Sequence, residues 1–153
     1  MHELLSHMAE VRFSKGELII SEGERNSNFY LLKKGIWRAY HLTEGTENSL
    51  WFAASGDTAF SSWGYVDGEV SPINIESMNE SIAYCISKPE LEALFLHSVD
   101  MANFGRRIFE REILSVDSST VAYGTPPTAK ERYMTLMEEN PELLQDVPLK
   151  YLA

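Results

Sequence analysis

The sequence contains one cysteine, Cys85, among its 153 residues. A single thiol excludes a disulfide within the chain, and it excludes a zinc or iron–sulfur site built only from cysteines of one chain. No apolar run approaches the ~18 residues that a membrane-spanning helix needs, and the N-terminus lacks the basic and apolar regions of a signal peptide. We therefore expect a cytoplasmic protein that makes no contact with a membrane.

Positive charge is also scarce in this chain. The formal net charge is −10, and no Lys or Arg occurs between Arg38 and Lys88, a stretch that holds seven acidic residues. A chain that repels phosphate backbones is a poor candidate for binding nucleic acid by itself. Hydrophobic residues make up 44% of the sequence, which is enough for one soluble domain with a real core.

Residues 12–86 consist of short apolar segments that are separated by turns containing glycine. Many short strands with frequent glycine turns predict an antiparallel sandwich or barrel, so the fold class is mainly β. Alternation of apolar and polar residues indicates that several strands have one buried face and one solvent-exposed face. The expected strands are Leu18–Ile20, Phe29–Leu32, Ile36–Leu42, Ser49–Ala53, Ile73–Ile75 and Ile82–Ile86.

Helical patterns follow from Ser87 onward. Residues 87–90, Ser-Lys-Pro-Glu, form a capping box that predicts a short helix, and a longer helix is expected from Val99 to about Ala122. Two apolar stripes run along the longer helix. They either form one wide face on the domain's own core, or one of them contacts a partner's equivalent helix. The first stripe contains Ala102, Phe109, Ile113, Val116, Thr120 and Tyr123, and the second contains Met101, Phe104 and Ile108.

The last thirty residues resemble the beginning of a further domain. Residues 124–127, Gly-Thr-Pro-Pro, end the long helix, and residues 128–131 form a second capping box that opens a helix ending before Pro141. One more helix begins near Pro148, and the sequence stops within it at Ala153. Because a single helical turn is not stable without packing against other elements, we expect a truncated domain here.

Several motifs, in order, resemble those of the Crp/Fnr family of transcription regulators, which includes the catabolite activators. The match covers nearly the whole chain, and the ordered series is more specific than any single motif. The motifs are residues 13–23, a strand-and-turn signature of cyclic-nucleotide-binding domains; residues 29–38, the next strand and its Lys-Gly turn; Gly56-Asp57, which precedes the phosphate-binding cassette; the two helices; residues 128–132; and residues 147–153, which look like the first helix of a helix-turn-helix.

This resemblance implies an organisation in three parts. Residues 1–98 would form an antiparallel, jelly-roll-like β-roll that binds an effector, residues 99–123 a dimerisation helix, and residues 124–153 the start of a truncated DNA-binding domain. We expect a homodimer that binds DNA only through residues missing from this chain. The dimer interface is predicted at Phe109, Ile113, Val116, Thr120 and Tyr123.

The family's cassette carries a Gly-Glu pair that holds the ribose and an Arg that pairs with the phosphate. Here Ser62 and Trp63 stand at the Gly-Glu pair, and Ser71 or Pro72 stands at the Arg. A buried anion needs a cation or several amide donors, and only Arg38 or Arg111 could reach in. We therefore predict that the domain does not bind cyclic AMP in the usual way, and a true cyclic-nucleotide module is an alternative.

A different small molecule could occupy the same segment. The polar and aromatic side chains there would suit a neutral or cationic effector of unknown identity, and no resident cofactor is predicted. The simpler interpretation is that Trp63 and Tyr65 fill the roll, and that the serines cap turns. The candidate ligand-binding residues are Ser61, Ser62, Trp63, Tyr65, Ser71, Asn74, Arg111 and Ser115.

Enzymatic functions have little support in the sequence. A cupin-type metal site needs clustered histidines, and the four histidines here are scattered, so no metal site is predicted. There is no Gly-x-Ser-x-Gly elbow and no glycine-rich phosphate loop, and Cys85 lies in an apolar strand. No catalytic residues are predicted. The remaining alternative is an effector-free β-roll that acts as a dimer scaffold for protein contacts.

Overall fold

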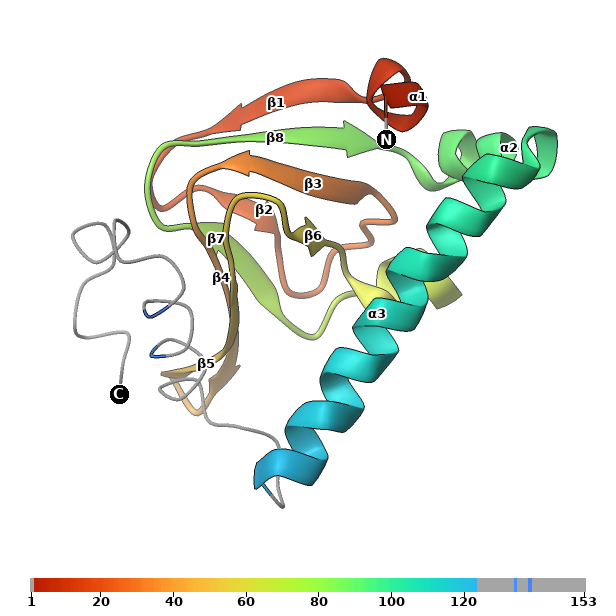
Figure 1. Cartoon of the computed structure of the whole chain (residues 1–153). Helices are drawn as coiled ribbons and strands as arrows, with labels where there is room; N and C mark the ends of the chain where they lie inside the picture. The colour runs from red at the N-terminus through yellow and green to blue at the C-terminus, as the bar shows by residue number, and fades with distance from the viewer. Residues whose placement is uncertain (1, 124–133, 135–137, 139–153) are drawn as a thin grey trace.

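The protein is described from a computed structural model (Figure 1). The structure describes the backbone of residues 2–123, 134 and 138, and the side chains of residues 3–114, 134 and 138. Eight strands come first in the chain with a short helix before them, and two helices follow. The elements are α1 (His2–Ser6), β1 (Ala9–Phe13), β2 (Leu18–Ile20), β3 (Phe29–Lys34), β4 (Trp37–Thr43), β5 (Thr46–Ala53), β6 (Thr58–Ala59), η1 (Trp63–Asp67), β7 (Asn74–Ser77), β8 (Ser81–Ile86), α2 (Lys88–His97) and α3 (Val99–Tyr123).

The strands form two four-stranded antiparallel sheets that together make a β-roll. One sheet has the order β1-β8-β3-β6, and the other has the order β2-β7-β4-β5. Most neighbouring strands are distant in sequence, as in the pairing of Phe29 with Ile86, and the exception is the hairpin of β4 and β5. The predicted mainly-β roll followed by helices is therefore confirmed. The short strands β1 and β6 and the π-type turn η1 were not predicted, because two to five residues carry too little periodicity.

The inside of the roll is filled with apolar side chains. Trp37 lies at the centre with no exposed surface, and its ring meets those of Phe13 and Tyr30 edge-on, each at a centroid distance of 5.6 Å. The indole nitrogen of Trp37 donates a 2.8 Å hydrogen bond to the hydroxyl of Ser81, so its polar atom is satisfied in the core. The interior between the two sheets is therefore occupied by the protein itself.

Two turns show how the glycine pattern determines the strand connections. Glu44 and Gly45 both have positive φ, the combination that a two-residue type I′ hairpin requires between β4 and β5. Gly35 joins β3 to β4 with a φ of 110°, and a Cβ there would lie 2.5 Å from the Cβ of Ser81. Both turns match positions where the sequence placed glycine between apolar segments.

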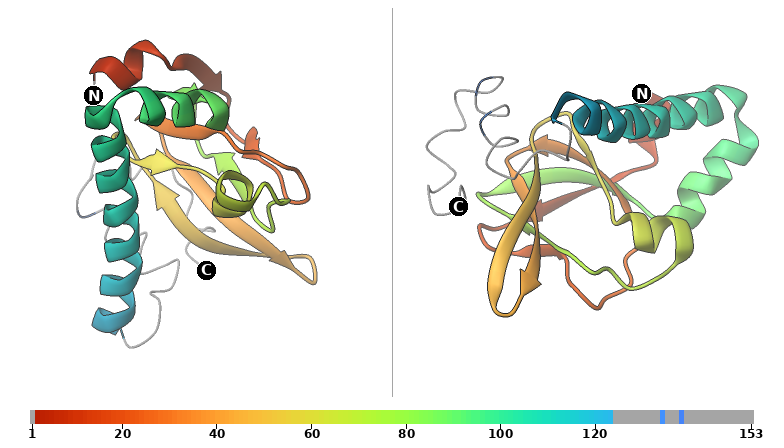
Figure 2. Two further views of the ribbon diagram at one scale, coloured as in Figure 1. Left: turned by 90° about the vertical axis from the view of Figure 1, so that its right-hand side faces the viewer. Right: turned by 90° about the horizontal axis from the view of Figure 1, so that it is seen from below.

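The helices pack on one side of the roll through a second apolar cluster. Ser87 caps α2 by accepting a hydrogen bond from the backbone of Glu90, and Ser98 caps α3 in the same way through Met101. Figure 2 shows α3 running along the roll after a sharp corner with α2. The cluster consists of Leu4, Phe29, Tyr65, Ile86, Leu91 and Met101, with Phe60, Phe104, Ile108 and Phe109 packed against it.

Candidate functional site

The candidate site is the segment between β6 and β7, which contains η1. The backbone of η1 lies against the loop before β3. The contact is so close that a Cβ on Gly64 would lie 2.0 Å from the carbonyl oxygen of Asn26. Ser61 is fully buried, and its hydroxyl accepts a hydrogen bond from the backbone N–H of Gly64 at 3.2 Å. Gly68 ends the turn in the left-handed conformation. The absence of a side chain at residue 64 therefore lets this segment close onto the roll.

Tyr65 connects η1 with both helices. Its ring packs 5.7 Å from the rings of Phe60 and Phe109, and its hydroxyl donates a 3.0 Å hydrogen bond to the carboxylate of Glu92 on α2. Burial raises the pKa of Tyr65, and the hydrogen bond to Glu92 raises it further. The side chain is thus part of the apolar cluster between the roll and the helices.

Ser71 and Asn74 are buried, and their polar atoms are bound to the backbone. The Ser71 hydroxyl donates to the carbonyl oxygen of Ile73 at 2.8 Å and accepts from its N–H at 3.2 Å. The side-chain oxygen of Asn74 accepts a 2.7 Å hydrogen bond from the N–H of Glu22. These groups organise the turn before β7, which leaves them poorly placed to contact a ligand.

The other candidate residues lie elsewhere. Ser62 and Trp63 are exposed on the outer side of η1, and Arg111 is exposed on α3. Ser115 lies on α3, but its side chain is outside the described part of the chain. The structure therefore does not gather the candidate residues around one polar hollow, because four of them are buried and three are exposed to solvent.

The predicted dimer stripe is also divided by the structure. Phe109 packs on its own roll, where its ring lies 6.4 Å from Phe29 and 5.7 Å from Phe60. Ile113 is 64% exposed, one helical turn further along α3. The side chains of Val116, Thr120 and Tyr123 lie outside the described residues, as do residues 124–133 and 139–153, where the further domain was expected.

Two cations, Lys88 and Arg25, are bound to backbone oxygens at the end of η1. The Lys88 ammonium donates to the carbonyl oxygens of Tyr65 and of Val66, the latter at 3.3 Å. The Arg25 guanidinium donates to the carbonyl oxygen of Gly68 at 3.1 Å. Both side chains thereby stabilise the end of η1, where carbonyl groups lack helical partners.

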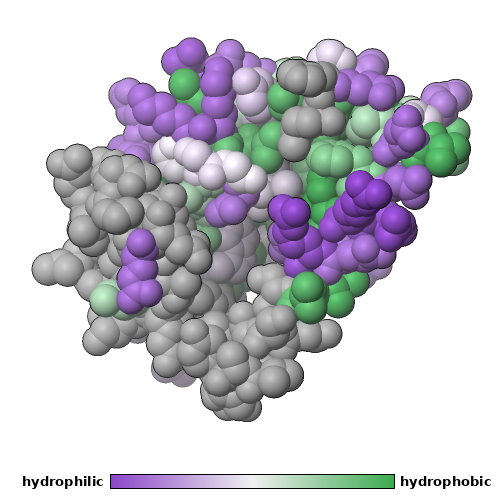
Figure 3. Space-filling view, viewed as in Figure 1, coloured by the Kyte–Doolittle hydropathy of each residue, from purple (hydrophilic) through white to green (hydrophobic). Residues whose placement is uncertain are grey.

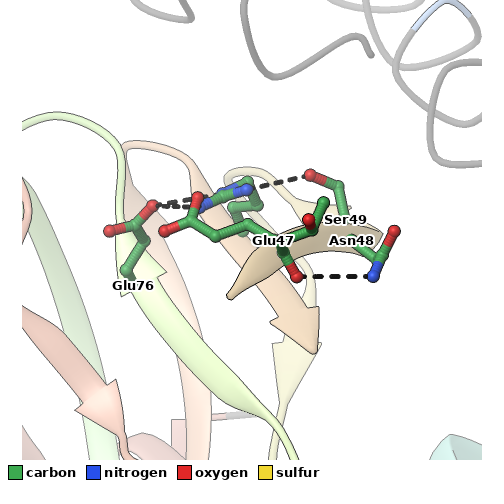
Figure 4. Close-up of polar contacts among 6 residues, drawn as sticks. Glu47, Asn48, Ser49 and Glu76 are labelled. Carbon is green, nitrogen blue, oxygen red and sulfur yellow. Dashed lines mark hydrogen bonds and ion pairs between the residues drawn. The ribbon is translucent and has the colours of Figure 1, made fainter. Parts of the chain in front are cut away.

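Arg38 lies on β4 within a cluster of ion pairs. It is one of the two cations that were expected from the sequence to be able to reach the site. Its guanidinium lies 2.8 Å from the carboxylate of Glu76 and 2.7 Å from that of Glu47, and it donates to the hydroxyl of Ser49 at 3.0 Å (Figure 4). It also lies 4.2 Å from the centre of the Tyr40 ring. This cluster was not predicted, because the three strands that form it are adjacent only in the folded sheet.

One small cavity lies between the roll and the helices, and its walls are wholly apolar. It is formed by Leu4, Phe29, Leu91, Phe95, Phe104, Gly105, Ile108 and Phe109. Such walls offer no partner for a phosphate or a ribose. Among the described residues, no three His, Cys, Asp or Glu side chains gather closely enough to hold a metal ion. No helix in the same part of the chain is both long and apolar enough to cross a bilayer.

A family described as "Cyclic nucleotide-binding domain" matches residues 10–98, which cover the roll except for its first residue, and all of α2. The chain belongs to this cyclic nucleotide-binding domain family. No curated protein has a detectably similar sequence. The family resemblance drawn from the sequence is therefore confirmed for the domain that contains the site.

Solved structures of transcription regulators share the fold of this cyclic nucleotide-binding domain. The catabolite activator protein of Thermus thermophilus has a TM-score of 0.66 at 16% identity, over 80% of this chain and 58% of that chain. FixK2 from Bradyrhizobium japonicum has a TM-score of 0.67 at 22% identity, over 90% and 67%. The sensor domain of DNR from Pseudomonas aeruginosa has a TM-score of 0.61 at 21% identity, over 74% and 76%. This chain thus spans a little over half the length of the Thermus protein.

Proposed function

We propose that this chain is the dimerising regulatory domain of a Crp/Fnr-type transcription regulator and that it does not recognise a cyclic nucleotide. The observation that carries the proposal is the electrostatics of the cassette segment. Residues 39–87 contain no Lys or Arg, while Arg38 is paired with two carboxylates, and Lys88 and Arg25 bind carbonyl oxygens. Within the described residues, a cyclic phosphate would therefore meet an acidic segment whose flanking cations, Arg25, Arg38 and Lys88, are bound to other groups.

The size of this effect follows from Coulomb's law. Two unit charges ~4 Å apart attract each other by about 4 kcal/mol at an effective dielectric constant of 20. Because each 1.4 kcal/mol is a factor of about ten in affinity, the missing cation weakens binding by roughly a thousandfold. Carboxylates such as Glu69, which is exposed beside η1, add repulsion to this loss.

Isothermal titration calorimetry of the chain with cyclic AMP and cyclic GMP tests the first half of the proposal. We expect no saturable heat in the micromolar range for either nucleotide. A micromolar dissociation constant for either one would contradict the electrostatic argument. It would instead favour a true cyclic-nucleotide module with a cation recruited from elsewhere.

The second half of the proposal rests on the exposed part of α3. Ile113 and Leu114 are both about two-thirds exposed, and Figure 3 shows apolar surface beside strongly hydrophilic surface on this helix. We expect the helix to cover these residues with the same surface of a second copy, since coiled helices bury such stripes. This interface uses Ile113, whereas Phe109 contacts its own roll.

Analytical ultracentrifugation of Ile113→Asp tests the dimer. A carboxylate buried in the interface is costly, so this variant should dissociate at least tenfold more readily than the parent chain. Leu96→Asp is the matched control, because Leu96 is an exposed apolar residue of α2 that lies outside the proposed interface. An Ile113→Asp chain that dimerises like the parent, or an equal effect of both variants, would refute the assignment.

An effector-free dimer scaffold is a second candidate, favoured by one observation. Ser61, Ser71 and Asn74, the buried polar residues of the predicted hollow, all bind backbone groups. Thermal unfolding with and without the low-molecular-weight fraction of a cell extract separates the two candidates, because a bound effector raises the midpoint by mass action. An unchanged midpoint supports the scaffold, and a raised midpoint supports a sensor of a different molecule.

A further inference from the structure

The outer side of η1 and the loop after it expose three apolar residues. Trp63 is 45% exposed, Val66 64% and Val70 42%. Trp63 and Val66 belong to η1, and Val70 lies in the loop after it. The turn is closed by a 3.0 Å hydrogen bond from the N–H of Glu69 to the carbonyl oxygen of Trp63. Figure 2 shows η1 on the outside of the roll. We call these three residues the cassette surface. Its exposure follows from the fold, since Gly64 and Tyr65 of the same turn are directed inward.

Four exposed acidic residues flank the cassette surface. Asp67 and Glu69 are exposed between the two valines. The loop that contains Glu22 and Glu24 pairs with the end of the segment, where the N–H of Ser71 donates to the carbonyl oxygen of Glu24 at 2.9 Å. Two cations, Arg25 and Lys88, donate to carbonyl oxygens of residues 65–68 and keep their charge, so the four carboxylates outnumber them. Apolar anchors are therefore combined here with an acidic rim.

We propose that the cassette surface is a docking site for a segment of another protein in which basic and apolar residues alternate. An exposed tryptophan beside aliphatic residues is the composition of an interaction hot spot, and the acidic rim favours a cationic partner. Nucleic acids and anionic lipid surfaces are disfavoured as partners, because the same carboxylates would repel both. The surface does not depend on whether the domain senses an effector.

Three synthetic peptides of equal length test the proposal with the intact chain. The first alternates lysine and leucine, the second replaces the lysines with glutamate, and the third replaces the leucines with serine. We expect the first to bind at least tenfold more tightly than either of the others, measured by fluorescence anisotropy. In ¹H–¹⁵N spectra its shift changes should fall on residues 62–70. Shift changes centred on α3, or spread evenly over the chain, would overturn the proposal.

Variants of the cassette surface provide the second measurement. Trp63→Ser should weaken binding of the lysine–leucine peptide at least tenfold, whereas Leu42→Ser, at an exposed apolar residue on β4, should leave it unchanged. Asp67→Lys combined with Glu69→Lys keeps the apolar residues and should weaken binding comparably, so the test does not depend on one variant folding. Unchanged affinity in both cassette variants would refute the docking site.

Discussion

The buried guanidinium of Arg38 allows a direct measurement of how much an ion pair contributes to the stability of this roll. The Arg38 side chain is only 2% exposed, and it forms ion pairs with two carboxylates. The side chain of Glu76 is 14% exposed, and that of Glu47 is 46% exposed. Replacing Arg38 with methionine keeps the length of the side chain and removes the charge. Glu76 is then left nearly buried without the cation that compensates it.

The expected magnitudes differ between the two carboxylates. Removing one partner of a buried ion pair costs about 3–5 kcal/mol, so Arg38→Met should lower the free energy of unfolding by that amount. Glu76→Gln keeps the shape of the side chain but removes a charged acceptor and should cost about 1.5–3 kcal/mol. Glu47→Gln should cost no more than about 1 kcal/mol, because solvent screens a pair that is half exposed.

Urea unfolding followed by tryptophan fluorescence reports these differences, since Trp37 lies in the neighbouring core. A double-mutant cycle of Arg38→Met with Glu76→Gln should show a coupling energy of about 0.5–3 kcal/mol. If Arg38→Met fails to fold, the unfolding free energies of Glu76→Gln and Glu47→Gln can still be compared, and they test whether burial determines the cost. Equal costs for Glu47→Gln and Glu76→Gln, or a cost below about 1 kcal/mol for Arg38→Met, would refute the argument from burial.

Two further predictions concern η1. Gly64→Ala places a Cβ against the main chain of Asn26 and should cost about 1–3 kcal/mol, with faster hydrogen exchange at residues 61–68; unchanged exchange there would contradict the close contact. Tyr65→Phe removes the hydrogen bond to Glu92 and should cost about 1 kcal/mol at pH 7. Because the pKa of Tyr65 is raised in the fold, the unfolded chain loses its proton first, so the free energy of unfolding should fall as pH rises above about 10. A weaker alkaline loss in Tyr65→Phe checks this sign, and an identical pH profile would contradict it.

Local patterns in the sequence were sufficient for six of the eight strands, the glycine turns between them and the cap of α2, but not for β1, β6 and η1. The glycines between apolar segments predicted the strand connections, and the capping box at Ser87 predicted α2, because both depend on backbone geometry within a few residues. The absence of Lys and Arg between residues 38 and 88 also needed no structure, since no fold can add a charge to the cassette's own segment.

Only the tertiary structure determined where the remaining side chains lie. Whether Arg38 could reach the cassette depended on the pairing of β4 with β5 and β7, which brings Glu47 and Glu76 to its guanidinium. The heptad pattern assigned Phe109 to a partner-facing stripe, but in the folded protein its ring packs against those of Phe29 and Phe60. Long-range contacts of this kind carry no local periodicity, so the composition of the site was readable from the sequence and its geometry was not.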